Sequence, residues 1–259
     1  MPTRFGCVMT PIYAEPRIAG ARNVDLPKHI GTGVLLASKQ KHFVVTAAHV
    51  LANRRQNRLY MPGSSFIEIK HDVIASCSLA PEITAKDNVD LCYFTLEKSE
   101  AASLQLSGHS FLPMDPEAVY GGEDDLSTAV FAVGGFPAFS VEVDHKKETS
   151  TVEPQYIQDV RLVGHNRITK LQGKGIGIHD RATLVLNIPA KIKINGKVTK
   201  RHEVNHLRGI SGGGIWMQVN NQPAKLAGIV TEFHHAHSIM LGSRLRPLIN
   251  VLANRHPSD

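Results

Sequence analysis

A single serine stands in the glycine-rich run Gly-Ile-Ser-Gly-Gly-Gly at residues 209–214, directly before the apolar pair Ile215-Trp216. Glycines on both sides permit a tight turn in which backbone N–H groups point to a spot beside the Ser211 hydroxyl. Acyl transfer needs this geometry, because such N–H groups stabilise the negative charge that develops on a carbonyl oxygen. A glycine-rich serine loop is weak evidence by itself, since most such loops are turns between strands.

Two upstream segments give the serine loop a chemical context. The β-type run Phe-Val-Val-Thr at residues 43–46 continues through two alanines to His49. Asp90 directly precedes the apolar stretch Leu91–Leu96, which has the composition of a strand. A serine hydroxyl becomes a good nucleophile only when a base takes its proton, and an imidazole base needs a carboxylate to fix its tautomer. His49, Asp90 and Ser211 are therefore the candidate base, orienting acid and nucleophile.

Asp87 is the alternative to Asp90 as the orienting acid. Asp90 stands at the edge of the expected strand, whereas Asp87 fits a turn before it, so we favour Asp90. A shift of the strand register would exchange the two.

The three segments, in this order, resemble the signatures of trypsin/chymotrypsin-fold serine peptidases: Thr-Ala-Ala-His, Asp-Leu before a strand, and Gly-x-Ser-Gly-Gly. The resemblance implies an all-β fold of two antiparallel, six-stranded-type β-barrels with a short C-terminal α-helix. It implies an oxyanion hole formed by the backbone N–H groups of Gly209 and Ser211. It also implies a substrate pocket near Asn205, six residues before the nucleophile.

Substrate binding is further expected along the strand edge Ile229-Val230-Thr231, where an extended peptide would add as a strand. Because Asn205 is neutral, the sequence does not support a salt bridge there to a lysine or arginine of the substrate. Five other polar residues are candidates for the pocket wall: His206, Glu232, His234, His235 and His237. Adjacent imidazoles without a cysteine cluster are weak evidence for zinc, so no metal and no other cofactor is expected.

Ile210 departs from the family pattern. Members that are activated by cleavage carry an acidic residue directly before the serine, which pairs with the newly formed amino terminus. Isoleucine cannot form that ion pair. We therefore expect that the chain is not matured by N-terminal cleavage, and that the serine loop is either preformed or ordered by a partner.

Short apolar runs separated by turn-forming residues predict the strands of the two barrels. The runs in the first half are Gly33–Ala37, His42–Thr46, Ser65–Lys70 and Leu91–Leu96. Four units are expected: an N-terminal arm at 1–28, a first barrel at 29–115, a second barrel at 116–244, and a C-terminal helix and tail at 245–259. Asn195-Gly196 predicts a type I′ hairpin, and the glycine-rich residues 173–177 are interpreted as another hairpin turn.

Composition argues against several classes of protein. The hydrophobic fraction of 42% is ordinary for a soluble chain, and no apolar run of about 18 residues predicts a membrane span. Only three widely spaced cysteines occur, and the first residues contain no apolar secretory segment, so a cytoplasmic, non-secreted microbial type is expected. The net charge of +6 permits weak attraction to acidic partners. The basic cluster Arg54, Arg55 and Arg58 lacks interleaved aromatic residues, so no specific nucleic-acid site is expected.

The sequence thus predicts a serine endopeptidase that hydrolyses peptide bonds of protein or peptide substrates through an acyl-enzyme. It also fits an effector that a regulatory protein partner switches on. The alternative is a catalytically silent member of the family that binds peptides, because the sequence does not establish that His49, Asp90 and Ser211 converge.

Overall fold

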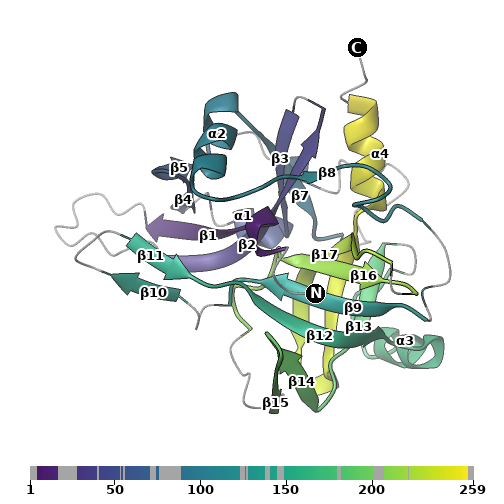
Figure 1. Cartoon of the computed structure of the whole chain (residues 1–259). Coiled ribbons are helices and arrows are strands. Elements are labelled where there is room, and N and C mark those ends of the chain that lie inside the picture. The colour runs from purple at the N-terminus through teal and green to yellow at the C-terminus, as the bar shows by residue number, and fades with distance from the viewer. Residues whose placement is uncertain are drawn as a thin grey trace.

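The computed structural model describes residues 5–16, 28–39, 41–52, 54, 56–70, 74–75, 89–122, 126, 128–137, 141–144, 149–179, 182–200, 207–220 and 222–255. Two large sheets make up most of this part of the chain, one in the upper and one in the lower part of Figure 1. A separate hairpin of β10 (Val141–Asp144) and β11 (Thr149–Val152) lies beside them.

The first sheet has the strand order β5-β4-β1-β2-β3-β7-β6, and β8 pairs in parallel with β2. Its strands are β1 (Met9–Pro16), β2 (Lys28–Ser38), β3 (Lys41–Thr46), β4 (Asn57–Pro62), β5 (Phe66–Glu68), β6 (Ile74–Ala75), β7 (Cys92–Leu96) and β8 (Leu112–Pro113). In the described residues no pairing joins its two ends, so this sheet is a half-barrel.

Apolar side chains cover both faces of the first sheet. Along β2, Leu35 packs inside the half-barrel with Val44, whereas Val34 and Leu36 face the second sheet. Successive side chains of a strand point to opposite faces, so a strand that is buried on both sides needs an uninterrupted apolar run. This explains why the sequence of the central strands does not alternate between apolar and polar residues.

The second sheet closes into a six-stranded barrel. The strand order β13-β18-β17-β16-β9-β12 is completed by pairing of β12 with β13, at Arg161↔Asn187 and Leu162↔Leu186. The strands are β9 (Val130–Gly135), β12 (Gln155–Leu162), β13 (Thr183–Asn187), β16 (Gly214–Gln218), β17 (Lys225–His234) and β18 (Ile239–Arg244), with β14 (Lys191–Ile194) and β15 (Lys197–Lys200) as a hairpin extending from β12.

The two sheets pack through a shared apolar layer. One buried apolar cluster contains side chains from both sheets: Val34, Phe43 and Tyr93 of the first, and Trp216 and Ile229 of the second. The helix α4 (Arg246–Arg255) adds Leu248 and Leu252 to this cluster, and Leu245 lies directly before it. The prediction of an all-β, two-barrel trypsin-like fold with a short C-terminal helix is therefore confirmed, although the first barrel is open.

Three other helices lie at the edges of the sheets. They are α1 (Ala48–Ala52), α2 (Lys98–Leu106) and α3 (His165–Gln172), and two 3-10 turns, η2 (Gly6–Val8) and η7 (His235–His237), complete the described elements. Gly173 follows the last turn of α3, and its N–H donates to the carbonyl of Thr169. The hairpin turn predicted at residues 173–177 is therefore wrong. The hairpin at Asn195-Gly196 is confirmed, and both residues have the positive φ that a type I′ turn requires (46° and 87°).

The structure also differs from the prediction near the N-terminus. Instead of an arm that covers the body, residues 9–16 form β1, which lies between β2 and β4 inside the first sheet. Prolines at positions 11 and 16 obscured this strand in the sequence, because proline cannot donate to a ladder. Both are tolerated, since pairing of β1 with β4 begins only at Tyr13 and Pro16 is the last residue of the strand.

Gly212 lies in the serine loop against Thr32 and Thr46 of the first sheet, and its φ is +86°. A Cβ built there would lie 1.9 Å from the carbonyl oxygen of Thr32 and 2.1 Å from Oγ1 of Thr46. Gly212→Ala should therefore lower the free energy of unfolding by about 2–4 kcal/mol through overpacking and backbone strain. Urea denaturation measures this loss. Gly177→Ala, at an exposed glycine with open space around it, is the matched control and should change the stability little; equal stability of the two variants would contradict the close contact.

Candidate active site

His49 and Asp90 come together because β3 and β7 are antiparallel neighbours. Thr46, the last residue of β3, pairs with Cys92, the first residue of β7. His49 follows β3 in α1, and Asp90 precedes β7, so the same end of the strand pair carries both. The backbone N–H of His49 donates to Oδ1 of Asp90 at 2.9 Å, and the ring nitrogen Nδ1 bonds Oδ2. The carboxylate thus holds both the backbone and the ring of His49.

This pairing sets the charge state and the tautomer of His49. The hydrogen bond that the His49 ring donates to Asp90 raises the pKa of His49 above 6.5, partial burial opposes the shift, and the charges of Asp90 and Glu232 add to it. With Nδ1–H donating to Asp90, the neutral ring keeps Nε2 as its proton acceptor. The side chains of His49 and Asp90 are 50% and 29% exposed, so the pair is accessible from solvent.

The serine loop is a compact turn before β16. Within it, the N–H of Ile210 donates to Leu207, that of Gly213 donates to Ile210, and that of Gly212 donates to Val230 of β17. The N–H groups of Gly209 and Ser211 make no hydrogen bond to any carbonyl in the described part of the chain. They are the two groups that the family resemblance assigns to the oxyanion hole.

The Ser211 side chain lies beside the end of β17. Its hydroxyl donates to the carbonyl of Thr231 at 3.4 Å, a long and therefore weak bond. The next residue, Glu232, is close enough for its charge to raise the pKa of His49. The end of β17 thus bonds the serine through Thr231 and acts electrostatically on His49 through Glu232.

The contacts of the Ile210 side chain are apolar. Its side chain is buried in the interior cluster of the second barrel, together with Val133 and Ile215. It also packs on Gly135, where a Cβ would lie 2.7 Å from Cγ1 of Ile210. The serine loop is therefore anchored by burial of this side chain rather than by an ion pair.

His29 of β2 packs directly on the serine loop from the other side. A Cβ built on Gly209 would lie 2.3 Å from Cε1 and 2.6 Å from Nδ1 of the His29 ring. Nε2 of His29 lies 2.7 Å from the carbonyl of Gly31, so Nε2 carries the proton and donates it. Burial lowers the pKa of His29 to about 4, although this hydrogen bond opposes the shift. His29 is thus a neutral ring at neutral pH.

The other residues predicted from the sequence have mixed outcomes. Asp87, Asn205 and His206 lie outside the described residues. Ile229 and Val230 do not form a free edge: Ile229 pairs with Gly214 and Ser243, and both backbone groups of Val230 bond the serine loop. The prediction failed because it could not include the pairing of β17 with the serine loop itself. Among the described strands only β18 pairs with β17 beyond Val230, so the open edge begins at Thr231.

The histidine-rich segment at the end of β17 carries local contacts. Nε2 of His234 lies 3.1 Å from Oε2 of Glu232, and Arg167 donates to the carbonyl of His237 at 2.6 Å. Within the described ranges, no group of three or more His, Cys, Asp or Glu side chains has a geometry that could hold a metal ion.

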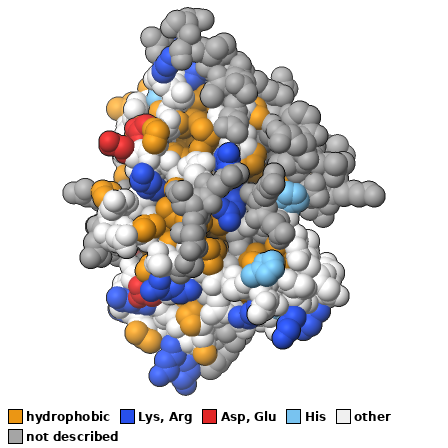
Figure 2. Space-filling model, turned by 90° about the vertical axis from the view of Figure 1, so that its right-hand side faces the viewer, with side chains coloured by type: hydrophobic (Ala, Val, Ile, Leu, Met, Phe, Trp, Pro, Cys, Tyr) orange, Lys and Arg blue, Asp and Glu red, His pale blue; other side chains and the backbone are white. Residues whose placement is uncertain are grey.

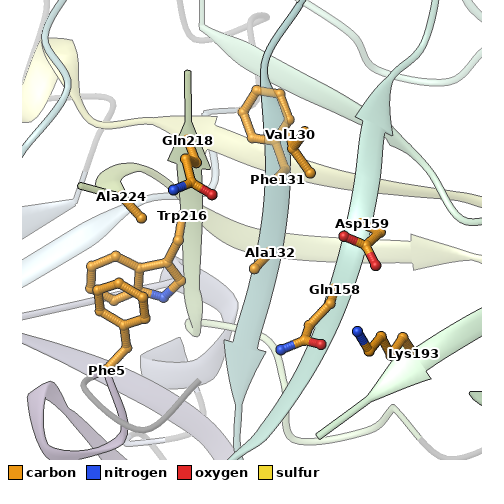
Figure 3. Close-up of a pocket in the computed structure, with 10 residues that line it drawn as sticks. All are labelled: Phe5, Val130, Phe131, Ala132, Gln158, Asp159, Lys193, Trp216, Gln218 and Ala224. Carbon is orange, nitrogen blue, oxygen red and sulfur yellow. The ribbon is translucent and has the colours of Figure 1, made fainter. Parts of the chain in front are cut away.

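A pocket of about 260 Å³ lies away from these residues, on β9, β12 and β16 (Figure 3). Phe5 stacks on Trp216 at one end, with ring centroids 4.0 Å apart, and Gln158 and Lys193 line the other end. Its lining includes neither His49, Asp90 nor Ser211, so this pocket is separate from the candidate site.

Basic side chains are concentrated on part of the surface. Lys and Arg side chains gather toward the lower end of the face in Figure 2, in keeping with the net charge of +6. In the part of the chain that is described, no helix has the length and the apolar character that a membrane span requires.

Comparisons with known proteins identify a structural likeness but no sequence match. No family model matches the sequence, and no curated protein matches it. Among solved structures, the active form of the Rv3671c protease from M. tuberculosis is similar, with 14% sequence identity and a TM-score of 0.46. The match covers 98% of this chain and 83% of that chain. This likeness is too distant to carry an activity over to the present chain.

The lowered pKa of His29 makes a prediction for stability at acidic pH. Because the folded pKa of about 4 lies below the unfolded value of 6.5, the unfolded chain binds the proton more readily between these values. Lowering the pH from 6.5 to 4 should therefore cost about 3 kcal/mol of stability through this group. His49, whose pKa is raised, acts with the opposite sign and above pH 6.5.

Urea denaturation at several pH values tests this prediction. His29→Gln should flatten the dependence of stability on pH between 4 and 6.5, whatever its effect on absolute stability. Ser110→Gln, at an exposed serine away from this contact, should leave the dependence unchanged. The same slope in His29→Gln as in the wild type would refute the assignment.

Proposed function

We propose that this protein is a serine endopeptidase in which Ser211 attacks the peptide carbonyl of a protein or peptide substrate. The observation that carries the proposal is the two-point bond between His49 and Asp90, because it leaves Nε2 of His49 as the proton acceptor. His49 then takes the proton of Ser211 and later donates it to the leaving amine. Asp90 holds the tautomer and stabilises the charged imidazole, and water hydrolyses the acyl-enzyme.

The backbone around Ser211 supports the same reaction. The N–H groups of Gly209 and Ser211 are available for the oxyanion, since neither donates to a carbonyl among the described residues. The edge of β17 from Thr231 onward can take an extended peptide as an added strand, which would place a peptide carbonyl beside Ser211. Neither step requires a cofactor.

The proposal favours a serine loop that is formed in the free protein. Burial of Ile210 in the second barrel supplies an anchor that needs neither a cleaved amino terminus nor a partner. We further propose that the peptidase acts in the cytoplasm, and that a regulatory protein partner switches its activity on. A silent peptide-binding module is the competing function.

Labelling with a fluorophosphonate probe tests the proposed reaction. The probe should label the wild type and not Ser211→Ala, because only an activated serine displaces the leaving group of the probe. Ser110→Ala, at an exposed serine outside the site, is the matched control and should label like the wild type. Absence of labelling in the folded wild type, alone and with candidate partners, would favour the silent module.

The pH dependence of labelling or peptide cleavage should report His49. Only the neutral imidazole accepts the serine proton, so the rate should fall as the pH drops through the pKa of His49, which lies above 6.5. Glu232 contributes to raising this pKa. Glu232→Gln should therefore shift the acidic limb of the profile to lower pH, while Glu117→Gln, on an exposed turn, should not shift it. A shift to higher pH, or none, would contradict the placement of Glu232 beside His49.

A further inference from the structure

Thr32 of β2 is fully buried, with 0% of its surface exposed, between the first sheet and the serine loop. Its hydroxyl donates to the carbonyl of Gly209 at 2.8 Å. The same oxygen accepts the N–H of Phe136 at 3.0 Å, from the segment directly after β9. One hydroxyl thus binds two segments of the second barrel, and one of them is the turn that carries the proposed oxyanion hole.

The backbone of Thr32 binds the same loop on the other side of Ile210. The N–H of Thr32 donates to the carbonyl of Ser211 at 2.8 Å, and its carbonyl accepts the hydroxyl of Thr46 at 2.6 Å. Thr46 stands three residues before His49, in the Thr-Ala-Ala-His segment. Through Thr32, direct hydrogen bonds join the strand that leads to His49 and the loop that carries Ser211.

These contacts leave Gly209 little freedom. The residue has a φ of +91°, and a Cβ on it would collide with the His29 ring and with the carbonyl of Phe136 at 2.7 Å. Its carbonyl is fixed by the Thr32 hydroxyl, so the position of the residue and the directions open to its N–H are restricted from both sides. In this chain the ion pair that Ile210 cannot form is replaced by two neutral contacts, the buried Ile210 side chain and the Thr32 hydroxyl.

We propose that Thr32 is a positioning residue, whose hydroxyl holds Gly209 in the conformation in which its N–H can stabilise the oxyanion. This inference rests on the proposed function. It predicts that the hydroxyl matters mainly in the transition state, where the charge on the substrate oxygen develops, and little for substrate binding.

The variants Thr32→Val and Thr32→Ser distinguish the effect of the hydroxyl group from the effect of the side-chain shape. Valine keeps the volume and leaves the carbonyl of Gly209 and the N–H of Phe136 without their partner, whereas serine keeps both bonds. Thr32→Val should lower kcat of peptide cleavage by about 10–100-fold with KM within about twofold, somewhat less than loss of a whole oxyanion donor. Thr32→Ser should stay within about threefold of the wild type.

Thr10→Val is the matched control. Thr10 is also a fully buried threonine of the first sheet, and its hydroxyl has no hydrogen-bond partner among the described residues. The same change of chemistry at that position should leave kcat and the labelling rate unchanged. Should Thr32→Val fail to fold, Thr32→Cys against Thr32→Ser is the second comparison, because a thiol of similar size is a weak donor.

The outcomes distinguish this inference from the proposed function. If the wild type is labelled and folded Thr32→Val is labelled at the same rate, Thr32 is not a positioning residue, and the serine peptidase stands. If the folded wild type is not labelled, the proposed function fails. Amide hydrogen exchange of residues 207–217 then tests independently whether the Thr32 hydroxyl restrains the serine loop. Faster exchange in Thr32→Val than in Thr32→Ser and Thr10→Val supports the restraint of the loop by the Thr32 hydroxyl. Equal exchange rates in the three variants overturn it.

Discussion

The hydrogen bonds between β2 and the serine loop are the constraint on which the candidate site depends. The N–H of Thr32 binds the carbonyl of Ser211, and the Thr32 carbonyl accepts the hydroxyl of Thr46 near His49. The two barrels supply different parts of the site, so a site of fixed geometry requires that their relative position be fixed as well. Apolar packing between the barrels is not directional, whereas buried hydrogen bonds specify one arrangement, because misaligned donors and acceptors would stay unsatisfied. The glycines of the loop allow this close approach.

The pair of His49 and Asp90 has a different origin, which is local to the first sheet. The register of β3 with β7 sets it, and the strands bury both faces, so a slip of one residue would turn apolar side chains away from their clusters. The pair is half-exposed, and ion pairs of that kind add little to stability. Packing of the strands behind the pair therefore offsets the conformational entropy lost when the two side chains are ordered. The Asp90 carboxylate can then set the tautomer and raise the pKa of His49.

Much of the fold, and the pairing of His49 with Asp90, could be predicted from the sequence, because the signals were local. The segment ending at His49, the strand after Asp90 and the glycine-framed Ser211 each form within a few residues. What escaped prediction depends on pairing between distant segments. Thr32 is 177 positions from the Gly209 carbonyl that it binds, and an apolar strand run gives no sign that one threonine points into an interface. Val230 was predicted as part of a free edge because its pairing with the serine loop is visible only in three dimensions.

Burial of Ile210 stabilises the conformation of the serine loop in a different way from an ion pair. An ion pair to a new amino terminus makes the loop conditional, since it forms only after cleavage and only while the terminal amine is charged. Burial of an apolar side chain carries no such condition, because its stabilisation depends on area removed from water and hardly on pH. A fully packed Ile210, together with uncharged partners around Gly209, therefore gives a loop whose shape is set by folding. If the chain is the proposed peptidase, control by a partner would have to act on access to the edge of β17 or on His49, rather than on formation of the loop.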